Sequence, residues 1–222
     1  MKKIITALFC SAAASAALAQ DRYDTSADFS PDGGMTAAER VWQMADALWP
    51  DLPAVWRVAD MEVPCGADGQ ANPRIFYCTT SNVIYIAQDF EQAGEAAYEM
   101  AHVLGHALQV RHGIADIALR EVRRRPDEER ALRTLVTRQV ECLAGFLVAN
   151  TGLPSRDFAS YGFVNEPFTG AHWGRDPVRI GPQVSIGLEA RAQAYGEGYA
   201  ARDPAVCAMG ELPIAPVLNA RR

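Results

Sequence analysis

The sequence predicts a mainly helical α+β domain with one small antiparallel sheet. Two β-branched and aromatic runs, Ile75–Cys78 and Val83–Ile86, are separated by four residues, which is typical of a hairpin. Apolar periodicity and end signals predict the helices, which we place at residues 36–49, about 94–113, 126–150 and 186–201. This balance of elements favours helices packed around a small sheet.

Each element has local support in the residues. Thr36 and Glu39 form a capping box that starts the first helix. Pro126, followed by acidic residues, starts the third helix. A short strand is predicted over Arg57–Val63, and the stretch 153–184 is predicted to be a long ordered loop. We therefore expect a single domain over residues 36–222.

The N-terminus is typical of a secretory signal peptide. Lys2 and Lys3 precede an apolar run that ends in the small residues before Gln20. We predict a signal peptide over residues 1–19, a flexible leader over 20–35, and a periplasmic or secreted location. No later apolar run approaches the length of a membrane span.

The charge of the chain restricts its partners. The formal net charge is −6, and removing Lys2 and Lys3 with the signal peptide changes it to −8, since −6 − 2 = −8. An acidic chain without a basic cluster argues against a nucleic-acid partner. The one basic run, Arg123–Arg125, is followed at once by three acids and is interpreted as a solvated face.

Four cysteines remain in the predicted mature chain: Cys65, Cys78, Cys142 and Cys207. An even number in an exported protein predicts two disulfides, for which three connectivities exist.

Two histidines indicate a metal site. His102 and His106 stand four residues apart in a helical segment, so both imidazoles lie on one helix face and can chelate one ion. The alternative is an ordinary packed helix face carrying two histidines. Gly105 between them favours a close approach of another element, because glycine inside a helix costs about 1 kcal/mol relative to alanine.

A zinc site needs a third protein ligand. His112 matches the spacing of a longer zinc motif, but Gln109 stands where that motif needs a glycine, so a continuing helix turns His112 away. Glu141 is the rival candidate, because a carboxylate in an apolar helix is costly unless paired or bound. An ion pair between Glu141 and Arg138 explains it equally well.

Four ordered stretches resemble the bacterial neutral zinc metallopeptidase family of the H-E-x-x-H type. They are "CGADGQANPRIFYCTTSNVIYIAQDF", "AAYEMAHVLGHALQ", "QVECLAGF" and "DPAVC". The resemblance implies a zincin-like fold and zinc held by His102, His106 and Glu141. It also implies the disulfide pairs Cys65–Cys78 and Cys142–Cys207.

The departures from that family concern catalysis. Val103 stands where the family has the glutamate that acts as general base, and Ala107 replaces a frequent second histidine. The Thr-His-Gly expected before the last helix is Val184-Ser185-Ile186. General acid–base help typically contributes about 10²–10⁴-fold to a rate, so its loss leaves at best a feeble peptidase.

Three functional hypotheses follow. The first is an exported zinc-binding pseudopeptidase that binds a peptide or protein ligand. The second is a slow metallopeptidase in which Glu99, one helical turn before Val103, replaces the missing base. The third is a metal-free structural or interaction protein.

Overall fold

A computed structural model describes residues 21–22, 35–59, 61, 74–90, 94–154, 157–174 and 184–222. The strands are β1 (Asp21–Arg22), β2 (Ala54–Val58), β3 (Ile75–Cys78), β4 (Val83–Ala87) and β5 (Trp173–Gly174). The α-helices are α1 (Ala37–Leu48), α2 (Ala96–Arg111), α3 (Ile114–Arg124), α4 (Glu129–Ala149), α5 (Leu188–Ala201) and α6 (Ala215–Asn219). Short 3₁₀ turns are η3 (Pro126–Glu128), η4 (Phe158–Tyr161) and η5 (Pro204–Cys207). The predicted mainly helical α+β class is confirmed.

The sheet has the strand order β1-β2-β4-β3-β5. The predicted hairpin is present as the antiparallel pair β3–β4, in which Cys78 faces Val83 across the turn. The sheet is larger than this hairpin and is mixed, because β2 pairs in parallel with β4 and β5 pairs in parallel with β3. The β5 strand therefore places a segment from late in the chain beside β3.

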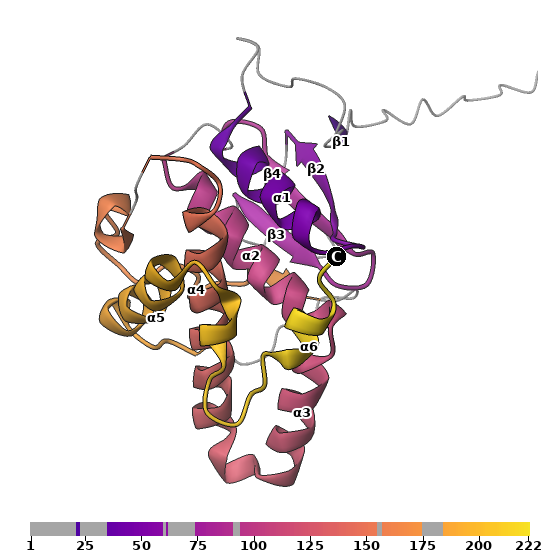
Figure 1. Cartoon of the computed structure of the whole chain (residues 1–222), viewed down its shortest axis with the longest axis vertical. Coiled ribbons are helices and arrows are strands. Elements are labelled where there is room, and N and C mark those ends of the chain that lie inside the picture. Colours follow the sequence, from indigo (N-terminus) through magenta and orange to yellow (C-terminus); the bar gives the residue numbers. More distant parts are fainter. Residues whose placement is uncertain are drawn as a thin grey trace, which may run out of the picture.

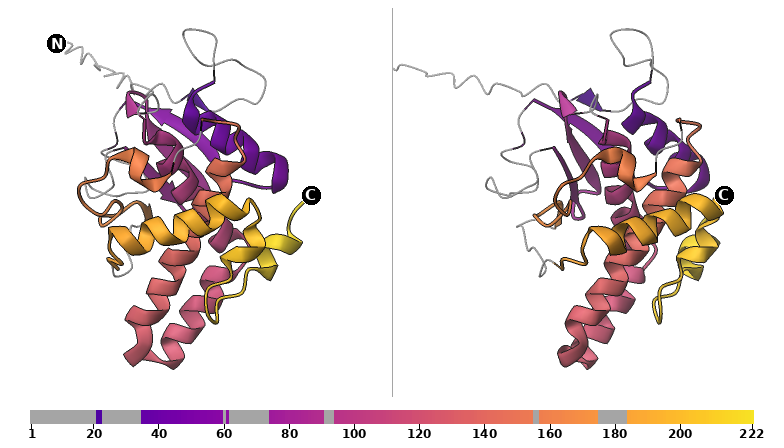
Figure 2. Two further views of the ribbon diagram at one scale, coloured as in Figure 1. Left: turned by 60° about the vertical axis from the view of Figure 1, so that its left-hand side comes forward. Right: turned by 90° about the vertical axis from the view of Figure 1, so that its left-hand side faces the viewer.

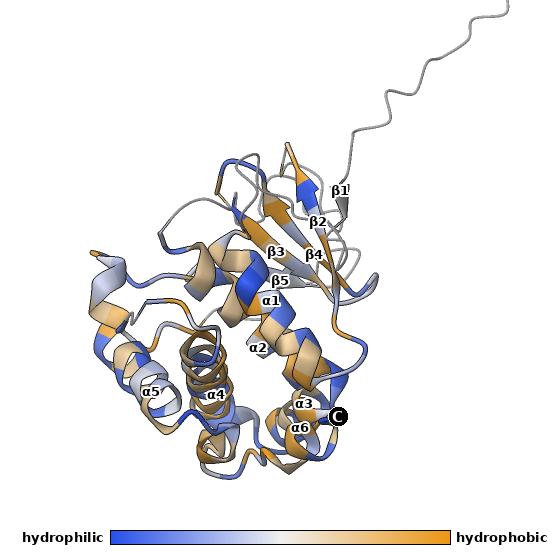
Figure 3. Cartoon of the chain, turned by 45° about the horizontal axis from the view of Figure 1, so that its top comes forward, coloured by the Kyte–Doolittle hydropathy of each residue, from blue (hydrophilic) through white to orange (hydrophobic). Residues whose placement is uncertain are grey.

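The helices pack against the sheet and one another around a single core. In Figure 1, α1 and α2 lie against the sheet, and α4 and α5 lie beyond α2. The views in Figure 2 show α3 and the first half of α4 projecting away from the sheet as a helical hairpin. Apolar residues gather on β3, β4 and α4, whereas α5 carries more polar ones (Figure 3). In this arrangement α2 is the central element, and 14 of its 16 residues are buried.

Local signals in the sequence located several of these elements. The capping box of Thr36 and Glu39 is present, with the Thr36 hydroxyl accepting from the Glu39 N–H. The predicted strand over Arg57–Val63 is misplaced, because β2 begins at Ala54 and ends at Val58. The helix α3 was not predicted, since Gly113 with a left-handed φ of 80° ends α2 and allows α3 to start at once.

Glycines allow the backbone of α4 to pack closely against two other helices, α2 and α5. A Cβ added to Gly105 of α2 would lie 3.0–3.1 Å from atoms of Val140, so the close approach inferred at Gly105 is made by α4. A Cβ on Gly145 of α4 would lie 1.9 Å from the carbonyl oxygen of Tyr195. Gly145 therefore faces α5, whereas the approach of α4 to the histidine helix is made at Gly105.

One predicted disulfide is present. Cys142 of α4 and Cys207 of η5 are bonded, which ties the C-terminal segment to the helix that carries Glu141. Cys78 is also disulfide-bonded. Its predicted partner Cys65 lies outside the described residues, so that pairing stays a prediction.

Residues 1–20 lie outside the described ranges, so the signal peptide stays a prediction as well. Within the predicted leader, Asp21 and Arg22 form β1 and pair with β2. No helix among the described residues is long and apolar enough to cross a membrane.

The contact between α4 and α5 gives a stability prediction. Gly198→Ala should lower the free energy of unfolding by about 1–3 kcal/mol or more, because its Cβ would lie 1.9 Å from the Cys142 carbonyl oxygen. Gly196→Ala on the same helix is the matched control, since nothing lies within 4 Å of its added Cβ. The control should gain up to about 1 kcal/mol from helix propensity. Urea unfolding measures both, and equal effects of the two substitutions would contradict the packing described.

Candidate metal centre

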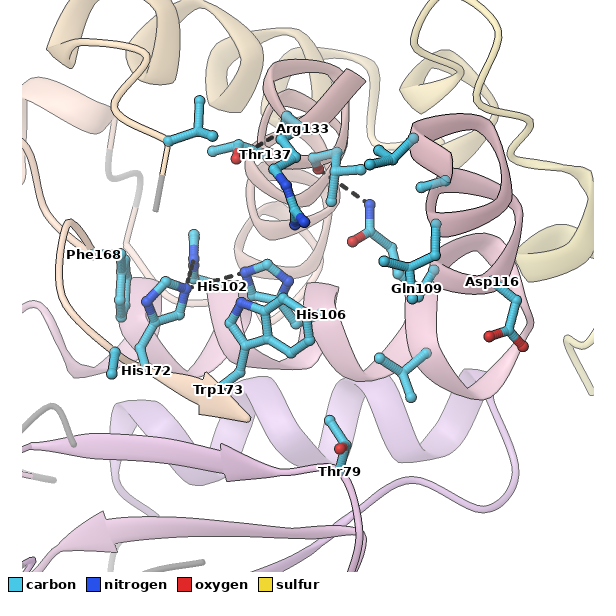
Figure 4. A pocket seen from close by; sticks show the side chains of 18 of the residues that line it. Thr79, His102, His106, Gln109, Asp116, Arg133, Thr137, Phe168, His172 and Trp173 are labelled. Atoms are coloured by element: carbon cyan, nitrogen blue, oxygen red, sulfur yellow. Dashed lines mark hydrogen bonds between the residues drawn. The ribbon is translucent and has the colours of Figure 1, made fainter. Parts of the chain in front are cut away.

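The helix α2 presents His102 and His106 on one face, one turn apart. Both side chains are buried, and their ring centroids lie 5.0 Å apart. Their Nε2 atoms point to one place at the end of a cleft, where a third imidazole meets them (Figure 4). The third ring belongs to His172.

The sheet fixes the position of His172. The residue directly precedes β5, and its carbonyl accepts a hydrogen bond of 2.9 Å from the N–H of Tyr77 in β3. The Thr79 N–H donates to the Gly174 carbonyl at 2.7 Å. These bonds flank β5 and hold the segment against the sheet, so that Nε2 of His172 lies 3.1 Å from Nε2 of both His102 and His106.

The outer nitrogens decide which tautomers the rings adopt. Nδ1 of His172 lies 2.8 Å from the Gly170 carbonyl, which can only accept, so Nδ1 carries the hydrogen and Nε2 keeps its lone pair. Nδ1 of His102 lies 3.1 Å from the Glu141 carboxylate, close to it but not aligned for a hydrogen bond. This carboxylate favours a hydrogen on Nδ1 of His102 and again leaves a lone pair on Nε2.

Converging lone pairs of this kind suit a cation. Two Nε2 lone pairs at 3.1 Å repel each other unless a positive charge lies between them. Burial lowers the pKa of His102, His106 and His172 well below the usual value, so the rings are neutral at pH 7. Neutral imidazole is the form that binds metals. These three residues form a group that could hold a metal ion, with ligand atoms within 4.8 Å of one another.

Aromatic side chains hold two of the rings in place. Phe168 stacks on His102 with centroids 3.9 Å apart and planes at 6°, and Trp173 stacks on His106 at 5.0 Å and 22°. Phe168 has a φ of 56°, a left-handed conformation that costs a bulky residue free energy. The surrounding contacts keep this conformation, which positions the Phe168 ring over His102.

Glu141, predicted as the third ligand, lies beside the histidine group and not within it. Its carboxylate contacts His102 at Nδ1, on the opposite side of the ring from Nε2. The guanidinium of Arg191 donates to Glu141, and the Tyr98 hydroxyl donates at 3.0 Å. The alternative ion pair with Arg138 is wrong, since the buried cation that pairs with Glu141 is Arg191 of α5. Burial raises the pKa of Glu141, while Arg191 and Tyr98 oppose that rise.

Arg191 links the site to the segment that precedes α5. Its Nε donates to Glu166 at 2.8 Å, and Glu166 also accepts from the Ser185 hydroxyl and from the Ile186 N–H at 2.9 Å. Burial raises the pKa of Glu166, but these hydrogen bonds outweigh burial and lower it. Of the three residues expected to be Thr-His-Gly from the resemblance, Val184 lines the cleft, whereas Ser185 and Ile186 bind Glu166.

The residues that the sequence relates to a missing or replacement base lie outside both the histidine group and the cleft. Val103 and Ala107 are fully buried in the hydrophobic core. Glu99, the predicted replacement base, is buried in the first turn of α2 and forms an ion pair with Arg74. None of these three residues lines the cleft described next. His112, at the C-terminal end of α2, also lies outside the histidine group.

The cleft itself has a volume of about 430 Å³ and starts at the three histidines. It runs between α2, α3 and α4, with Thr79 of the β3–β4 turn on the sheet side (Figure 4). Asp116 is the only carboxylate among the described residues that line it. Figure 4 shows Asp116 beyond Gln109, at the far end from His172.

Comparison with known proteins adds no relative. No protein-family model, no curated protein and no solved structure matches this chain. The resemblance to zinc metallopeptidases therefore stays an expectation from the motifs, and the three-histidine group is the observation on which function is argued.

His172 was not among the predicted ligands, although it is one of only four histidines in the chain. It lies 66 residues beyond His106, within the stretch expected to be a loop, and no spacing rule connects it to α2. The signal that could have found it is local. His172 is followed by Trp173 and flanked by Gly170 and Gly174, in a segment otherwise rich in aromatic residues.

A pH prediction tests whether Glu99 is a structural residue. Burial raises the pKa of Glu99 from 4.5 to about 7. Between these values the folded chain binds more protons at Glu99 than the unfolded chain, so stability is fully present below about pH 4.5 and falls as pH rises to about 7. The loss should reach up to about 3 kcal/mol.

Glu99→Gln should remove this part of the pH dependence and raise the free energy of unfolding at about pH 8. Urea unfolding from about pH 5 to about pH 8 measures it. Glu95→Gln is the comparison variant: Glu95 pairs with the same Arg74, and its charge is a smaller cause of the raised Glu99 pKa than burial, so the slope should be reduced only in part. An unchanged slope in Glu99→Gln would contradict the raised pKa.

Proposed function

We propose that this protein is an exported, metallopeptidase-like zinc-binding protein whose peptidase chemistry is impaired. The observation that carries the proposal is the convergence of three buried Nε2 atoms, two of which present lone pairs to each other at 3.1 Å. Catalytic and ligand-binding zinc sites use such a donor set, in which three histidines bind the ion and the fourth coordination position is open to a cleft. The ordered motifs of the sequence support the same proposal independently.

The geometry favours His102, His106 and His172 as the zinc ligands. Glu141, the third ligand implied by the family resemblance, supports the site from the next layer by contacting Nδ1 of His102. A carboxylate on the outer nitrogen of a metal-binding histidine sets its tautomer and raises its basicity. In this proposal Glu141 keeps a role in metal binding without touching the ion.

Zinc in this position supplies Lewis acidity toward a ligand oxygen at the end of the cleft. The chain itself supplies orientation: Phe168 and Trp173 fix two rings, and the Gly170 carbonyl fixes the third. Among the described residues we find no base there, because Val103 is buried in the core and Glu99 is paired with Arg74. Binding of a peptide or protein ligand is therefore favoured over rapid hydrolysis.

The bound metal is the first test. The purified chain should contain one zinc ion, and His172→Ala should lose most of it because one of three protein ligands is removed. His112→Ala is the matched control and should retain the zinc. Glu141→Gln should weaken zinc binding by about 10–100-fold, the usual cost of losing an outer partner. Elemental analysis and competition with a zinc chelator give these values.

Two outcomes of that experiment would contradict the proposal. Full zinc content in His172→Ala would remove His172 from the site. A native chain that contains no zinc and takes up none at micromolar concentration would support the metal-free structural protein instead.

Peptidase activity is the second test. The native chain should cleave unfolded casein no faster than the same chain treated with a chelator, because Asp116, the one carboxylate among the described residues that line the cleft, lies at the end away from His172. Fast zinc-dependent cleavage would overturn the impaired-peptidase assignment. Comparing Glu99→Gln with Asp116→Asn would then show which carboxylate acts as the base.

A further inference from the structure

The cleft contains a hydrogen-bond acceptor whose direction is fixed by neighbouring groups. Nε2 of Gln109 donates to the Val136 carbonyl at 3.1 Å and to Oε1 of Gln139 at 2.9 Å. Gln139 in turn donates to the Cys207 carbonyl at 3.0 Å. Both carbonyls can only accept, which sets the orientation of both amides. Oε1 of Gln109 is consequently turned into the cleft (Figure 4), where no described residue donates to it.

A cation faces the same cleft from α4. The guanidinium of Arg133 projects into it in Figure 4, from the helix opposite the histidines. Only its Nε is occupied, by Glu129 one turn earlier at 2.7 Å. Its two terminal nitrogens have no partner among the described residues, although a guanidinium can bind both oxygens of a carboxylate.

The wall between α3 and α4 is apolar. Ala118, Leu119 and Val122 of α3 face Val136 of α4 across the cleft. Leu119 is 41% exposed, which is unusual for a large apolar side chain on a helix that packs against another. The cleft thus combines an apolar wall, a guanidinium with two unoccupied terminal nitrogens and one fixed acceptor, beside the histidine group.

From these groups we infer that the cleft binds the C-terminal end of a peptide whose last side chain is apolar. The terminal carboxylate binds Arg133, a backbone N–H donates to Oε1 of Gln109, and the last side chain packs against Leu119 and Val122. This inference rests on the proposed function only in placing the preceding peptide bond toward the histidines. A cleft of about 430 Å³ has the size of ordinary small-ligand sites.

The fixed acceptor separates a peptide from a fatty acid. A fatty acid satisfies Arg133 and the apolar wall, but it has no N–H for Gln109, and an acceptor covered without a donor costs free energy. A peptide end satisfies all three features. The amide of Gln109 cannot flip to accommodate a fatty acid, because a flip would set its oxygen against the Val136 carbonyl.

The test uses the full chain and two fluorescein-labelled tetrapeptides that end in leucine, one with a free carboxylate and one with a terminal amide. Fluorescence anisotropy should show the carboxylate peptide binding about 10-fold or more tightly, as expected for a charge-assisted hydrogen bond. Arg133→Gln should abolish this preference. Arg130→Gln, at an exposed position three residues earlier on α4, is the matched control and should keep it. Dodecanoate should compete poorly with the carboxylate peptide.

Equal binding of the two peptides, no binding of either up to about 1 mM, or an unchanged preference in Arg133→Gln would overturn the inference. Displacement by dodecanoate at lower concentrations than by the unlabelled peptide would assign the cleft to fatty acids instead. Zinc content, measured on the same samples, keeps the two proposals apart. Zinc without carboxylate preference refutes only the peptide site, and carboxylate preference without zinc refutes only the metal site.

Discussion

The buried ion pair between Glu141 and Arg191 is the interaction on which the arrangement of the helices depends. The two side chains are 0% and 1% exposed, and they join α4 to α5 at the point where the carboxylate also contacts Tyr98 and His102 of α2. Removing one partner of such a pair leaves an uncompensated charge and usually costs about 3–5 kcal/mol. The close backbone contact at Gly145 and Gly198 makes this pairing geometrically feasible, because it brings α5 against α4. The Glu141–Arg191 pair, called the polar centre below, therefore takes part both in helix packing and in the surroundings of the histidine group.

This polar centre also sets the charge of the proposed site. With Glu141 as the third ligand, as the motifs imply, a zinc ion with two histidines and one carboxylate would carry a single positive charge. With the three neutral imidazoles proposed as ligands, the ion would keep its full charge, and Arg191 would neutralise the carboxylate outside it. A site of higher positive charge is a stronger Lewis acid and attracts anions more strongly. Substituting a histidine for a carboxylate at the third position thus changes the ligands that the cleft favours.

The sequence predicted those features that neighbouring residues determine. The capping box at Thr36, the hairpin from Ile75 to Ile86 and the histidine helix depend on short spacings, and each is present. The Cys142–Cys207 bond joins residues 65 apart, and it was expected only because the resemblance implied it. Features that depend on distant pairings were missed. Whether Glu141 binds a metal, Arg138 or Arg191 is decided by which helix lies opposite α4, and no pattern along α4 contains that information. The same holds for His172, whose place follows from the pairing of β5 with β3.

The order in which the chain can complete the histidine group follows from that pairing. His102 and His106 are set as soon as α2 forms, since they depend on one helical turn. His172 reaches them only after the chain from α4 to β5 has closed a loop of 66 residues back to His106. The conformational entropy of closing such a loop is lost before the contact contributes any stabilisation, so non-local pairings form slowly. We therefore expect folding to pass through a species in which α2 has formed and placed His102 and His106, while His172 is not yet in position. A metal ion bound early by His102 and His106 would speed the docking of β5, because the ion attracts the imidazole of His172.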